Sequence, residues 1–583
     1  MVNRHLATHL RSRLMGMSSD SAVMSSSTAR RRLRCTAMGA AAAALAVATL
    51  GAPAQAAGQQ IWVNPGSGND SANGSQDAPL RTLAAAWNRI GQGGTAAAGS
   101  TINLLPGTYA RNSMPYYWEN RHGSTSAPLT IRAAGAARSA VLLGDLNMYD
   151  IDYLVIDGLA IAPRGDAFHC EDCGNVTIKN STLDGRDGGS YAAHETFKAN
   201  QSHDLHLLNN VIVGADDNAI DMVAVKRATI TGNNISGADD WCAYTKGGSS
   251  SIDVVGNEIH DCGVGGFTAG QGTGLEFMVA PDTTYEATDV RVSGNFVHDT
   301  EGAAFGVNGG DRIQIVDNVA TRVGTRSHLL EVTFGARSCD GNSTRCQQLL
   351  NSGAWGTSTP GGDVIVHIPD QDVSIQRNTI VNPSGVHSQW QHFEISTPRT
   401  NAISATLKGP ATARTDTGLV ITDNVIRNGS SSMPLGIDNS SVCTNSNPTC
   451  TVTQILRDND INGSTSVAVP TRVPTGVPPL GPRPSPTQPT PKPTAKPKAP
   501  RITKLKAGRG KVKVSWSRVS AHPTVNRYRV KALPGGRTCT TTGTSCTVKK
   551  LSKGKNYRFT VTAHNAKGWS SPSKQSKKVR TKR

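Results

Sequence analysis

The sequence predicts an all-β protein, a right-handed parallel β-helix solenoid followed by a small β-sandwich. A short phrase, apolar-x-x-Asn-x-apolar, recurs with its Asn at Asn210, Asn233 and Asn257, in steps of 23 and 24 residues. A period in the twenties with short strand phrases is typical of a solenoid. Glycine is frequent, at 60 residues, and aromatic residues make up only 5% of the chain, which favours short strands and turns over helical bundles. Parallel strands joined by crossovers favour the right-handed coil.

The first 56 residues have the pattern of an export signal. Four arginines between Arg30 and Arg34 precede an apolar run from Met38 to Leu50, and Ala54-Gln55-Ala56 offers a small-residue cleavage site. We therefore predict a signal peptide at 1–56 and a secreted, extracellular protein. The apolar run is too short to span a bilayer. The general and twin-arginine export routes both stay open.

The cysteines agree with export. Cys35 lies in the signal, and the other ten form close pairs, as expected for disulfides in an exported chain. The Cys-Glu-Asp-Cys motif resembles half a metal site, but the chain has no second half. The predicted disulfides are Cys170-Cys173, Cys242-Cys262, Cys339-Cys346, Cys443-Cys450 and Cys539-Cys546.

Charge is divided sharply along the chain. Residues 471–583 carry 28 Lys and Arg and no Asp or Glu, whereas residues 57–470 carry 25 basic and 41 acidic residues. The basic tail predicts either simple solubility or attachment to a polyanion such as an acidic polysaccharide or the cell wall. Nucleic acid is not an expected partner for an exported protein, and we expect a monomer.

The solenoid is predicted over residues 57–465. A strand at Ile61, a helix with apolar spacing from Leu80 to Ile90 and a second strand at Thr101–Leu105 form a predicted cap for its open end. Strand phrases without intervening helices then follow. Long intervals of 38, 60 and 46 residues indicate either one rung with an inserted loop or two rungs. The fourth positions of the phrases are Leu159, Ser181, Asn210, Asn233, Asn257, Asn295, Asn318, Asn378, Asn424 and Asn459.

The repeated asparagines are predicted to be structural. An amide side chain stacked at a turn can satisfy backbone groups and the asparagine of the next rung. A Pro/Thr/Lys-rich linker is predicted at 466–500 and a separate domain at 501–583. Trp516 in an early strand and Tyr557 at a tyrosine corner make this domain resemble a fibronectin type III domain, which implies a β-sandwich that acts as a spacer or a binding module.

Charged residues gather in three successive rungs. Lys198 and Asp221 each lie 12 residues before the asparagine of their rung, and Lys246 lies 11 before Asn257. If the turn after Lys246 is one residue shorter, the three residues are predicted to form one outward column. Carboxylates lie just upstream, at Glu195, Asp216, Asp217, Asp239 and Asp240. One interpretation is a surface ladder of salt bridges. The carboxylates, however, outnumber the lysines, and excess like charge favours a bound cation. Oxygen-only ligands select a hard ion such as Ca²⁺.

Calcium, carboxylates and lysine together suggest β-elimination. Ca²⁺ on the carboxylate of a uronic acid would acidify the C5 proton, and a neutral lysine would take that proton as the 4-O-linked sugar leaves. A free lysine has a pKa of about 10.4, so the site must lower it, and we expect an alkaline optimum.

The patch resembles the family 9 polysaccharide lyases, which are pectate lyases of the right-handed β-helix fold. The resemblance rests on Asp216-Asp217-x-x-x-Asp221, with Glu195 one rung earlier and Lys246 one rung later. It implies pectate as the substrate, Glu195, Asp216, Asp217 and Asp221 as Ca²⁺ ligands, and Lys246 as the base. From their position in the same cluster we also predict Asp240 as a ligand and Lys198 as a catalytic residue. The chain departs from the family by one extra residue in the acidic motif and by Glu at 195.

Two other classes of function stay open. A β-helix glycoside hydrolase would use the carboxylates, although neither Gly-His-Gly nor Arg-Ile-Lys, which would match family 28, appears in the sequence. A non-catalytic glycan-binding or surface-attachment protein would bind saccharide without turnover. Trp241, Trp355 and Trp390 are candidates for stacking on sugar rings in any of these cases.

Overall fold

The computed structural model describes most of the chain after the predicted signal peptide. The described residues are 58–583 without 164–165, 187–194, 281, 340–342, 353–355, 359–364, 396–417, 430–436, 439–451, 464–465, 481–496, 518, 520–524, 526, 566–567 and 583. The chain separates into two compact units, one up to Pro478 and one from Pro479. No helix among the described residues is long and apolar enough to cross a membrane.

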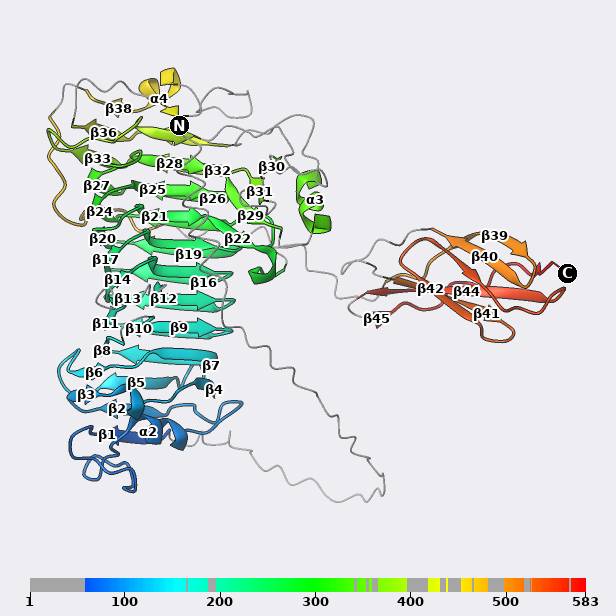
Figure 1. Ribbon diagram of the computed structural model, residues 1–583, viewed down its shortest axis with the longest axis horizontal. Coiled ribbons are helices and arrows are strands. Elements are labelled where there is room, and N and C mark those ends of the chain that lie inside the picture. Colours follow the sequence, from blue (N-terminus) through cyan, green and yellow to red (C-terminus); the bar gives the residue numbers. More distant parts are fainter. Residues whose placement is uncertain are drawn as a thin grey trace, which may run out of the picture. The chain divides into compact units, whose positions relative to one another are not determined.

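The first unit is a parallel β-helix built from three ladders of parallel strands (Figure 1). The first ladder contains β1 (Gln60–Val63), β2 (Thr101–Leu104), β5 (Leu129–Ala133), the second half of β7 (Leu146–Asp157), β10 (Gly174–Lys179), β13 (His203–Leu208), β16 (Lys226–Thr231), β19 (Ser249–Val255), β23 (Ala287–Ser293), β26 (Gly310–Val316), β32 (Gln371–Gln376) and β35 (Val420–Thr422).

The second ladder carries the predicted site. It contains β4 (Trp118–His122), the first half of β7, β9 (Phe168–Glu171), β12 (Glu195–Asn200), β15 (Asn218–Val223), β18 (Trp241–Lys246), β21 (Gly265–Gly270), β25 (Ala303–Asn308), β28 (Leu330–Thr333), β34 (Phe393–Ile395) and β37 (Ile437–Asp438).

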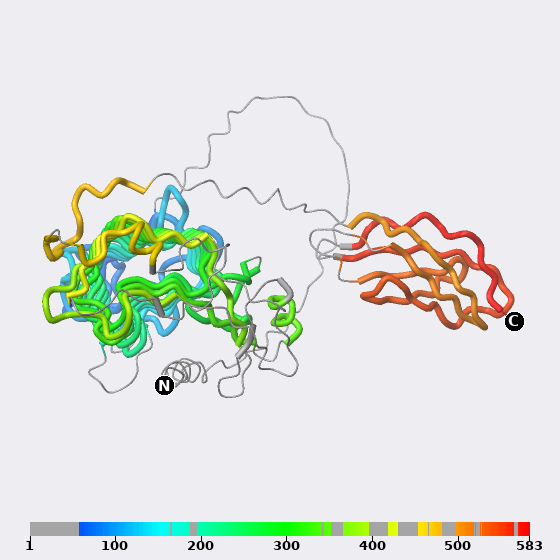
Figure 2. Tube along the Cα trace, turned by 90° about the horizontal axis from the view of Figure 1, so that it is seen from above, coloured from blue at the N-terminus to red at the C-terminus, as the bar shows by residue number. Residues whose placement is uncertain are grey.

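The third ladder completes each rung. It contains β3 (Gly107–Tyr109), β6 (Ala140–Leu142), β8 (Leu159–Ile161), β11 (Thr182–Asp184), β14 (Val211–Ala215), β17 (Asn234–Ala238), β20 (Glu258–His260), β24 (Phe296–Thr300), β27 (Val319–Val323), β33 (Thr379–Asn382), β36 (Val425–Asn428) and β38 (Asp460–Ile461). Seen from above, successive rungs overlie one another (Figure 2).

Apolar side chains stack inside the coil, one above another. Ile178, Leu207 and Ile230 follow each other in register on the first ladder, and each is at most 1% exposed. Phe168 and Phe197 stack on the second ladder with parallel rings 5.1 Å apart. Because successive side chains of a strand point to opposite faces, the residues between these core positions point outward.

The predicted asparagine ladder is confirmed. The Oδ1 atom of Asn257 accepts hydrogen bonds from the backbone N–H and the Nδ2 of Asn233, at 2.9 and 3.0 Å, and its own Nδ2 donates to the carbonyl of Ile230. The same contacts link eight asparagines, all of them at or beside a corner of the coil. They are Asn210, Asn233, Asn257, Asn295, Asn318, Asn378, Asn424 and Asn459.

The recurring phrase covers a corner of the coil. It includes the end of a first-ladder strand, one residue in the left-handed region and the start of a third-ladder strand. That residue precedes the ladder asparagine, as at Asn209, Gly256 and Asp317, with φ of 56°, 63° and 58°. Asn, Asp and Gly tolerate this conformation best, which explains their frequency at the corner.

The three long intervals are single rungs with insertions, since Asn257 bonds directly to Asn295, Asn318 to Asn378, and Asn378 to Asn424. The expectation of no helices between strands is wrong. The insertion between Asn318 and Asn378 holds α3 (Ser343–Ser352), β29 (Gly335–Ser338), β30 (Gly356–Ser358) and β31 (Ile365–Ile368). These strands form a four-stranded sheet with β22 (Gly272–Gly274), which comes from the insertion between Asn257 and Asn295. A second helix, α4 (Val452–Asp458), replaces the first half of the last predicted strand phrase, Leu456–Ile461.

The helix of the N-terminal cap is shorter than predicted. Leu80 forms a bridge with Val63, and α2 (Leu83–Arg89) begins only after Thr82, whose side chain caps it by accepting from the N–H of Ala85. Leu83, Ala86 and Trp87 are buried on its inner face. The described part of the first unit also contains two single turns of 3₁₀ helix, at Arg111–Ser113 and Leu275–Phe277.

The second unit is a β-sandwich. One sheet contains β39 (Ile502–Gly508), β40 (Lys511–Trp516) and β43 (Ser545–Val548). The other contains β41 (Arg527–Leu533), β42 (Thr538–Thr541), β44 (Asn556–Asn565) and β45 (Gly568–Trp569), with β46 (Val579–Arg580) paired to β44. Trp516 is buried, and the backbone N–H of Ser552 donates to the hydroxyl of Tyr557 at 2.9 Å, which confirms the predicted tyrosine corner.

Asn257→Ala is expected to lower the free energy of unfolding of the β-helix by about 2–3 kcal/mol, because two buried donors of Asn233 lose their acceptor. Urea denaturation followed by circular dichroism measures the change. Asn234→Ala is the matched control, since Asn234 is only half-buried and its Nδ2 donates to Glu258 at 2.7 Å. Equal losses in the two variants would contradict a structural role for the ladder.

Candidate functional site

The candidate site lies on the outward face of β12, β15 and β18 in the second ladder. Lys198 on β12 is in register with Asp221 on β15, as predicted. The next residue in this outward column is Tyr244 on β18, followed by Thr268 on β21. The column therefore brings an ammonium, a carboxylate and a phenol together on three adjacent rungs, about 4.8 Å apart.

The predicted position of Lys246 in this column is wrong. Lys246 is in register with Val223, two residues beyond Asp221. The prediction counted back from Asn257 and assumed a shortened turn, but the turn after β18 is one residue longer than its neighbour, since Asp221 pairs with Tyr244 while Ala228 pairs with Ile252. Lys246 therefore reaches the site from the adjacent outward position.

Both lysines nevertheless converge on Asp221. The Nζ of Lys198 lies 2.8 Å from Glu195 Oε1 and 3.6 Å from Asp221 Oδ2, and the Nζ of Lys246 lies 4.0 Å from the same Oδ2. Lys246 also donates to the Tyr244 hydroxyl at 2.9 Å and to Gln271 Oε1 at 3.3 Å. The lysine side chains are 26% and 15% exposed, whereas that of Asp221 is only 2% exposed. Two solvent-accessible cations thus cover a buried carboxylate.

The remaining predicted carboxylates lie at the corner before these strands. Asp216 and Asp239 are exposed, Asp217 is half-buried and Asp240 is buried. The Asp240 N–H donates to the backbone carbonyl of Asp217 at 2.9 Å, so that these two residues stack on adjacent rungs. The side chain of Asp217 accepts from Asn218 Nδ2 at 2.5 Å.

The fit of this set to Ca²⁺ depends on its oxygen atoms. Within the described part of the chain, Glu195 Oε2, Asn218 Oδ1 and Asp221 Oδ1 are buried and have no hydrogen-bond partner. Glu195 and Asn218 are in register on β12 and β15. Buried, unsatisfied oxygens suit a hard cation. The five predicted carboxylate ligands, however, do not form a group of three with oxygens within 4.8 Å of one another among the described residues.

Burial dominates the electrostatics of the site. It raises the pKa of Glu195 to about 8, because the Lys198 ammonium offsets only part of the desolvation. Burial also opposes the charge on Lys198, but Asp221 and then Glu195 outweigh it and raise the pKa of this lysine. Burial, and then the charges of Asp221 and Asp217, raise the pKa of Tyr244 well above 10. Burial therefore favours the neutral form of Glu195, while Lys198 keeps its charge.

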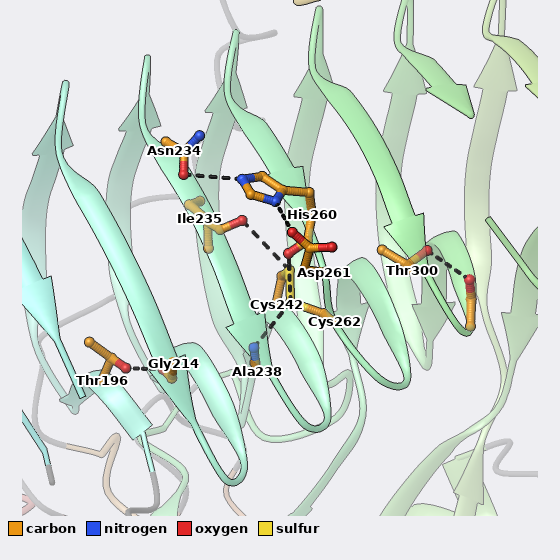
Figure 3. The surroundings of a disulfide bond; sticks show 11 residues. Thr196, Gly214, Asn234, Ile235, Ala238, Cys242, His260, Asp261, Cys262 and Thr300 are labelled. Atoms are coloured by element: carbon orange, nitrogen blue, oxygen red, sulfur yellow. Dashed lines mark hydrogen bonds and ion pairs between the residues drawn. A yellow bond between two sulfur atoms is a disulfide. The ribbon is translucent and has the colours of Figure 1, made fainter. Parts of the chain in front are cut away.

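A disulfide and a buried ion pair fix the two ends of β18. Cys242, the second residue of β18, is bonded to Cys262 in the turn after β20 (Figure 3). At the other end, the N–H of Gly247 donates to Glu286 Oε2 at 3.0 Å, and Glu286 Oε1 lies 2.9 Å from the guanidinium of Arg337. Glu286 and Arg337 are fully buried, so the insertion that carries Arg337 holds the turn that follows Lys246.

Three site residues were not found from the sequence. Tyr244 and Asn218 carry no charge, and His169 on β9, in register with Lys198, lies in a rung whose phrase has Ser181 in place of the asparagine. Burial and then Lys198 lower the pKa of His169. The strand register alone would have found all three.

The tryptophans divide between packing and exposure. Trp241 is 3% exposed and packs with Tyr244 and Ala303, so it is a packing residue. Trp390 is 43% exposed and remains a candidate for stacking on a sugar ring. Trp355 lies outside the described residues.

Four of the five predicted disulfides are confirmed. They are Cys170–Cys173, Cys242–Cys262, Cys339–Cys346 and Cys539–Cys546. The pair Cys443 and Cys450 lies outside the described residues. The disulfides are consistent with an extracellular protein.

The pKa of Glu195 predicts a pH-dependent stability. The folded state keeps this proton above pH 4.5, where the unfolded chain has lost it, so this group's contribution to stability falls as the pH rises from about 4.5 to about 8. Glu195→Gln, which is neutral throughout, is expected to flatten the decline of Tm across this window in scanning calorimetry. Glu119→Gln, at an exposed position, is the control. An unchanged Tm profile in Glu195→Gln would contradict the raised pKa.

Comparisons with known proteins match both units. Residues 154–343 match the family model described as a right handed beta helix region, and residues 495–579 match that of the fibronectin type III domain. No curated protein sequence matches the chain.

Solved structures are similar to the chain at low identity. A GH136 lacto-N-biosidase from Eubacterium ramulus is 11% identical over 63% of this chain and 68% of its own, with a TM-score of 0.35. The twitchin kinase region from C. elegans is 24% identical over 15% of this chain and 17% of its own, with a TM-score of 0.14. The human fibronectin type III domain containing protein 3 has a domain that is 27% identical over 15% of this chain and 88% of its own, with a TM-score of 0.14. This chain thus spans less than a fifth of the twitchin structure. It contains a right-handed parallel β-helix region and a fibronectin type III domain, as the sequence predicted.

Proposed function

We propose that this chain is a secreted enzyme that cleaves an acidic polysaccharide, pectate in the first instance, by β-elimination at the outward face of β12, β15 and β18. The observation that carries this proposal is the convergence of Lys198 and Lys246 on the buried Asp221. Two accessible ammonium groups on one face suit a substrate with regularly spaced carboxylates.

Lys246 is the residue we assign to proton abstraction. It is the lysine with fewer acidic contacts, since Lys198 lies within 3.6 Å of both Glu195 and Asp221 and its pKa is raised. In the reaction, the Nζ of Lys246 takes the C5 proton of the uronic acid. The C4–O bond breaks, the leaving sugar departs with its oxygen, and a C4–C5 double bond forms in the product.

A lysine base must be neutral, so the negative charge of Asp221 beside Lys246 must be offset. Asp221 Oδ2 lies 4.0 Å from Nζ of Lys246 and favours its charged form. Glu195, Asn218 and Asp221, with their unsatisfied oxygens, are the residues that would hold Ca²⁺. Ca²⁺ bound there would supply positive charge that lowers the lysine pKa. It would also make the C5 proton more acidic.

An alkaline optimum is part of the proposal. Glu195 has a pKa raised to about 8, so it offers a charged ligand oxygen only above that pH. The alkaline optimum of the proposal therefore follows from the raised pKa of Glu195.

A second candidate function is glycoside hydrolysis. A buried, protonated Glu195 beside the carboxylate of Asp221 resembles the acid and the anion of a two-carboxylate hydrolase, and both contact the same Lys198 ammonium. This mechanism needs Glu195 protonated and so predicts activity below pH 8. It makes Glu195, and not Lys246, the essential proton-transfer group.

An assay on polygalacturonate distinguishes these functions. The mature protein is incubated at pH 8–9 with Ca²⁺ and then with chelator, while the ultraviolet absorbance of unsaturated uronide and the reducing ends are followed. We expect a chelator-sensitive rise in absorbance, and a loss of at least about 100-fold in kcat for Lys246→Ala, as for removal of a general base. Lys179→Ala is the matched control, since Lys179 pairs with Asp157 on the first ladder.

Each other outcome has its own meaning. Reducing ends without unsaturation, abolished in Glu195→Gln, would replace elimination by hydrolysis. Binding without any product, on pectate, alginate and glycosaminoglycans alike, would leave a non-catalytic glycan-binding protein. Full activity of Lys246→Ala would remove this lysine from the mechanism.

We also propose that the fibronectin type III domain attaches the enzyme to an anionic polymer. Residues 501–583 contain 23 Lys and Arg and no Asp or Glu. Arg527, Arg529 and Lys531 are exposed along β41, and the guanidinium of Arg529 lies 4.3 Å from the ring centroid of Trp569. A cationic row beside an aromatic ring suits an acidic polysaccharide.

Salt and charge variants test this attachment. Replacing Arg527, Arg529 and Lys531 together by Ser is expected to weaken binding to immobilised polygalacturonate about tenfold at low salt, because each surface ion pair contributes up to about 1 kcal/mol. Binding of the unchanged chain should fall as salt is added. The control replaces Lys574, Lys577 and Lys578 by Ser, which removes the same charge at other exposed positions. Equal losses in the two triple variants would show that only net charge matters.

A further inference from the structure

We infer that His328, Glu331 and Glu394 form a binding site for a divalent transition-metal ion, separate from the face around Asp221. Their ligand atoms, one from each side chain, all lie within 4.8 Å of one another, and no other such group of His, Cys, Asp and Glu occurs in the part of the chain that the structure describes. This inference does not depend on the proposed lyase activity.

The β-helix places the three side chains. Glu331 on β28 and Glu394 on β34 are in register on adjacent rungs of the second ladder. His328 lies just before β28 and is 1% exposed. The backbone N–H of Leu329 donates to the carbonyl of His392 at 2.9 Å and ties the segment that carries His328 to the rung that carries Glu394. Two rungs therefore fix all three residues.

The distance between His328 and Glu394 matches a metal site better than a hydrogen bond. His328 Nδ1 lies 3.6 Å from Glu394 Oε2, which is too long for a hydrogen bond. Ligand atoms about 2.1 Å from a tetrahedral ion lie about 3.4 Å from each other, close to the observed separation. The described chain offers a contrast at His298, whose Nδ1 lies 2.6 Å from Asp299 Oδ2 and so forms a direct hydrogen bond.

The chemistry of the set selects the ion. Two carboxylates directly opposite each other on neighbouring strands repel, and a cation between them removes that cost. The imidazole nitrogen favours a transition ion such as Zn²⁺ over Ca²⁺. The Ser327 hydroxyl donates to Glu331 Oε1 at 2.7 Å, which orients this carboxylate as outer hydrogen bonds do in metal sites. Three protein ligands leave a coordination position for water or for an oxygen of a bound molecule.

The site shares a face with the predicted catalytic residues. The outward column that passes through Asp221 and Tyr244 continues through Thr268 and Gly306 to Glu331. Three rungs separate Tyr244 from Glu331, or about 14 Å. Trp390 is 43% exposed, and its ring centroid lies 5.4 Å from that of His328. The open coordination position is thus on the side of the coil where a polysaccharide would lie, next to an exposed aromatic ring.

Zinc binding to the full chain tests the site. The protein is stripped with chelator and titrated with Zn²⁺ by calorimetry, and Tm is measured with and without the ion. We expect one Zn²⁺ per chain and a rise in Tm. Glu331→Gln and Glu394→Gln should each weaken binding about tenfold or more and reduce the rise in Tm. Asp221→Asn should bind Zn²⁺ as the unchanged protein does, which separates this site from the proposed Ca²⁺ site.

Glu258→Gln is the matched control. Glu258 Oε1 lies 3.3 Å from His298 Nε2 on the third ladder, so this change also removes one carboxylate beside a histidine. It should leave zinc affinity unchanged. The inference is wrong if Glu258→Gln, and not Glu331→Gln, loses the ion, or if the unchanged protein binds no stoichiometric Zn²⁺. Should both glutamine variants fail to fold, the visible spectrum of Co²⁺ added to the unchanged protein decides: intense bands show that the ion is held at low coordination number, as expected for this site, and weak bands of six-coordinate Co²⁺ would contradict the inference.

Discussion

The buried asparagine ladder is the interaction on which the rest of this β-helix depends. A coil of parallel strands must turn a corner on every rung, and each turn leaves backbone groups inside the protein. The amide of each ladder asparagine accepts from the backbone N–H of the rung before it, as Asn257 does from Asn233, and donates to a carbonyl. Insertions between rungs leave this contact intact, since Asn318 bonds to Asn378 across 60 residues. Register is therefore preserved along the whole coil.

That register creates the candidate site. Because the first and second ladders are held in step, Lys198, Asp221 and Tyr244 fall in one outward column, although nothing in their local sequences places them together. Two lysines cover the buried Asp221, and burial raises the pKa of the neighbouring Glu195. Ligand sites often contain close like charges on a rigid scaffold, because the free energy of folding offsets their mutual repulsion.

An insertion supports the candidate site from outside the regular coil. Arg337, in an insertion strand, forms a fully buried ion pair with Glu286, and Glu286 accepts from the Gly247 N–H beside Lys246. A short corner of the coil could not bury such a pair, because both charges must be surrounded by protein atoms to be shielded from water. The corner before β28 brings His328 to the same face, next to Glu331 and Glu394. The polar residues of this face therefore come from strands and corners of the coil, and an insertion supports the turn beside Lys246.

The sequence by itself determined the repeat, the structural role of the asparagines, the fibronectin type III domain and four disulfides of the described chain, because each depends on local spacing and on residue type. It also identified Lys198, Asp221 and Lys246 as neighbours. Tertiary structure alone decided that Tyr244, and not Lys246, follows Asp221, since one extra residue in a turn shifts the register and the sequence does not show on which side of a strand that residue lies. It alone decided the protonation of Glu195 and the meeting of His328 with Glu394, because burial and contacts between distant residues arise only when the rungs are stacked.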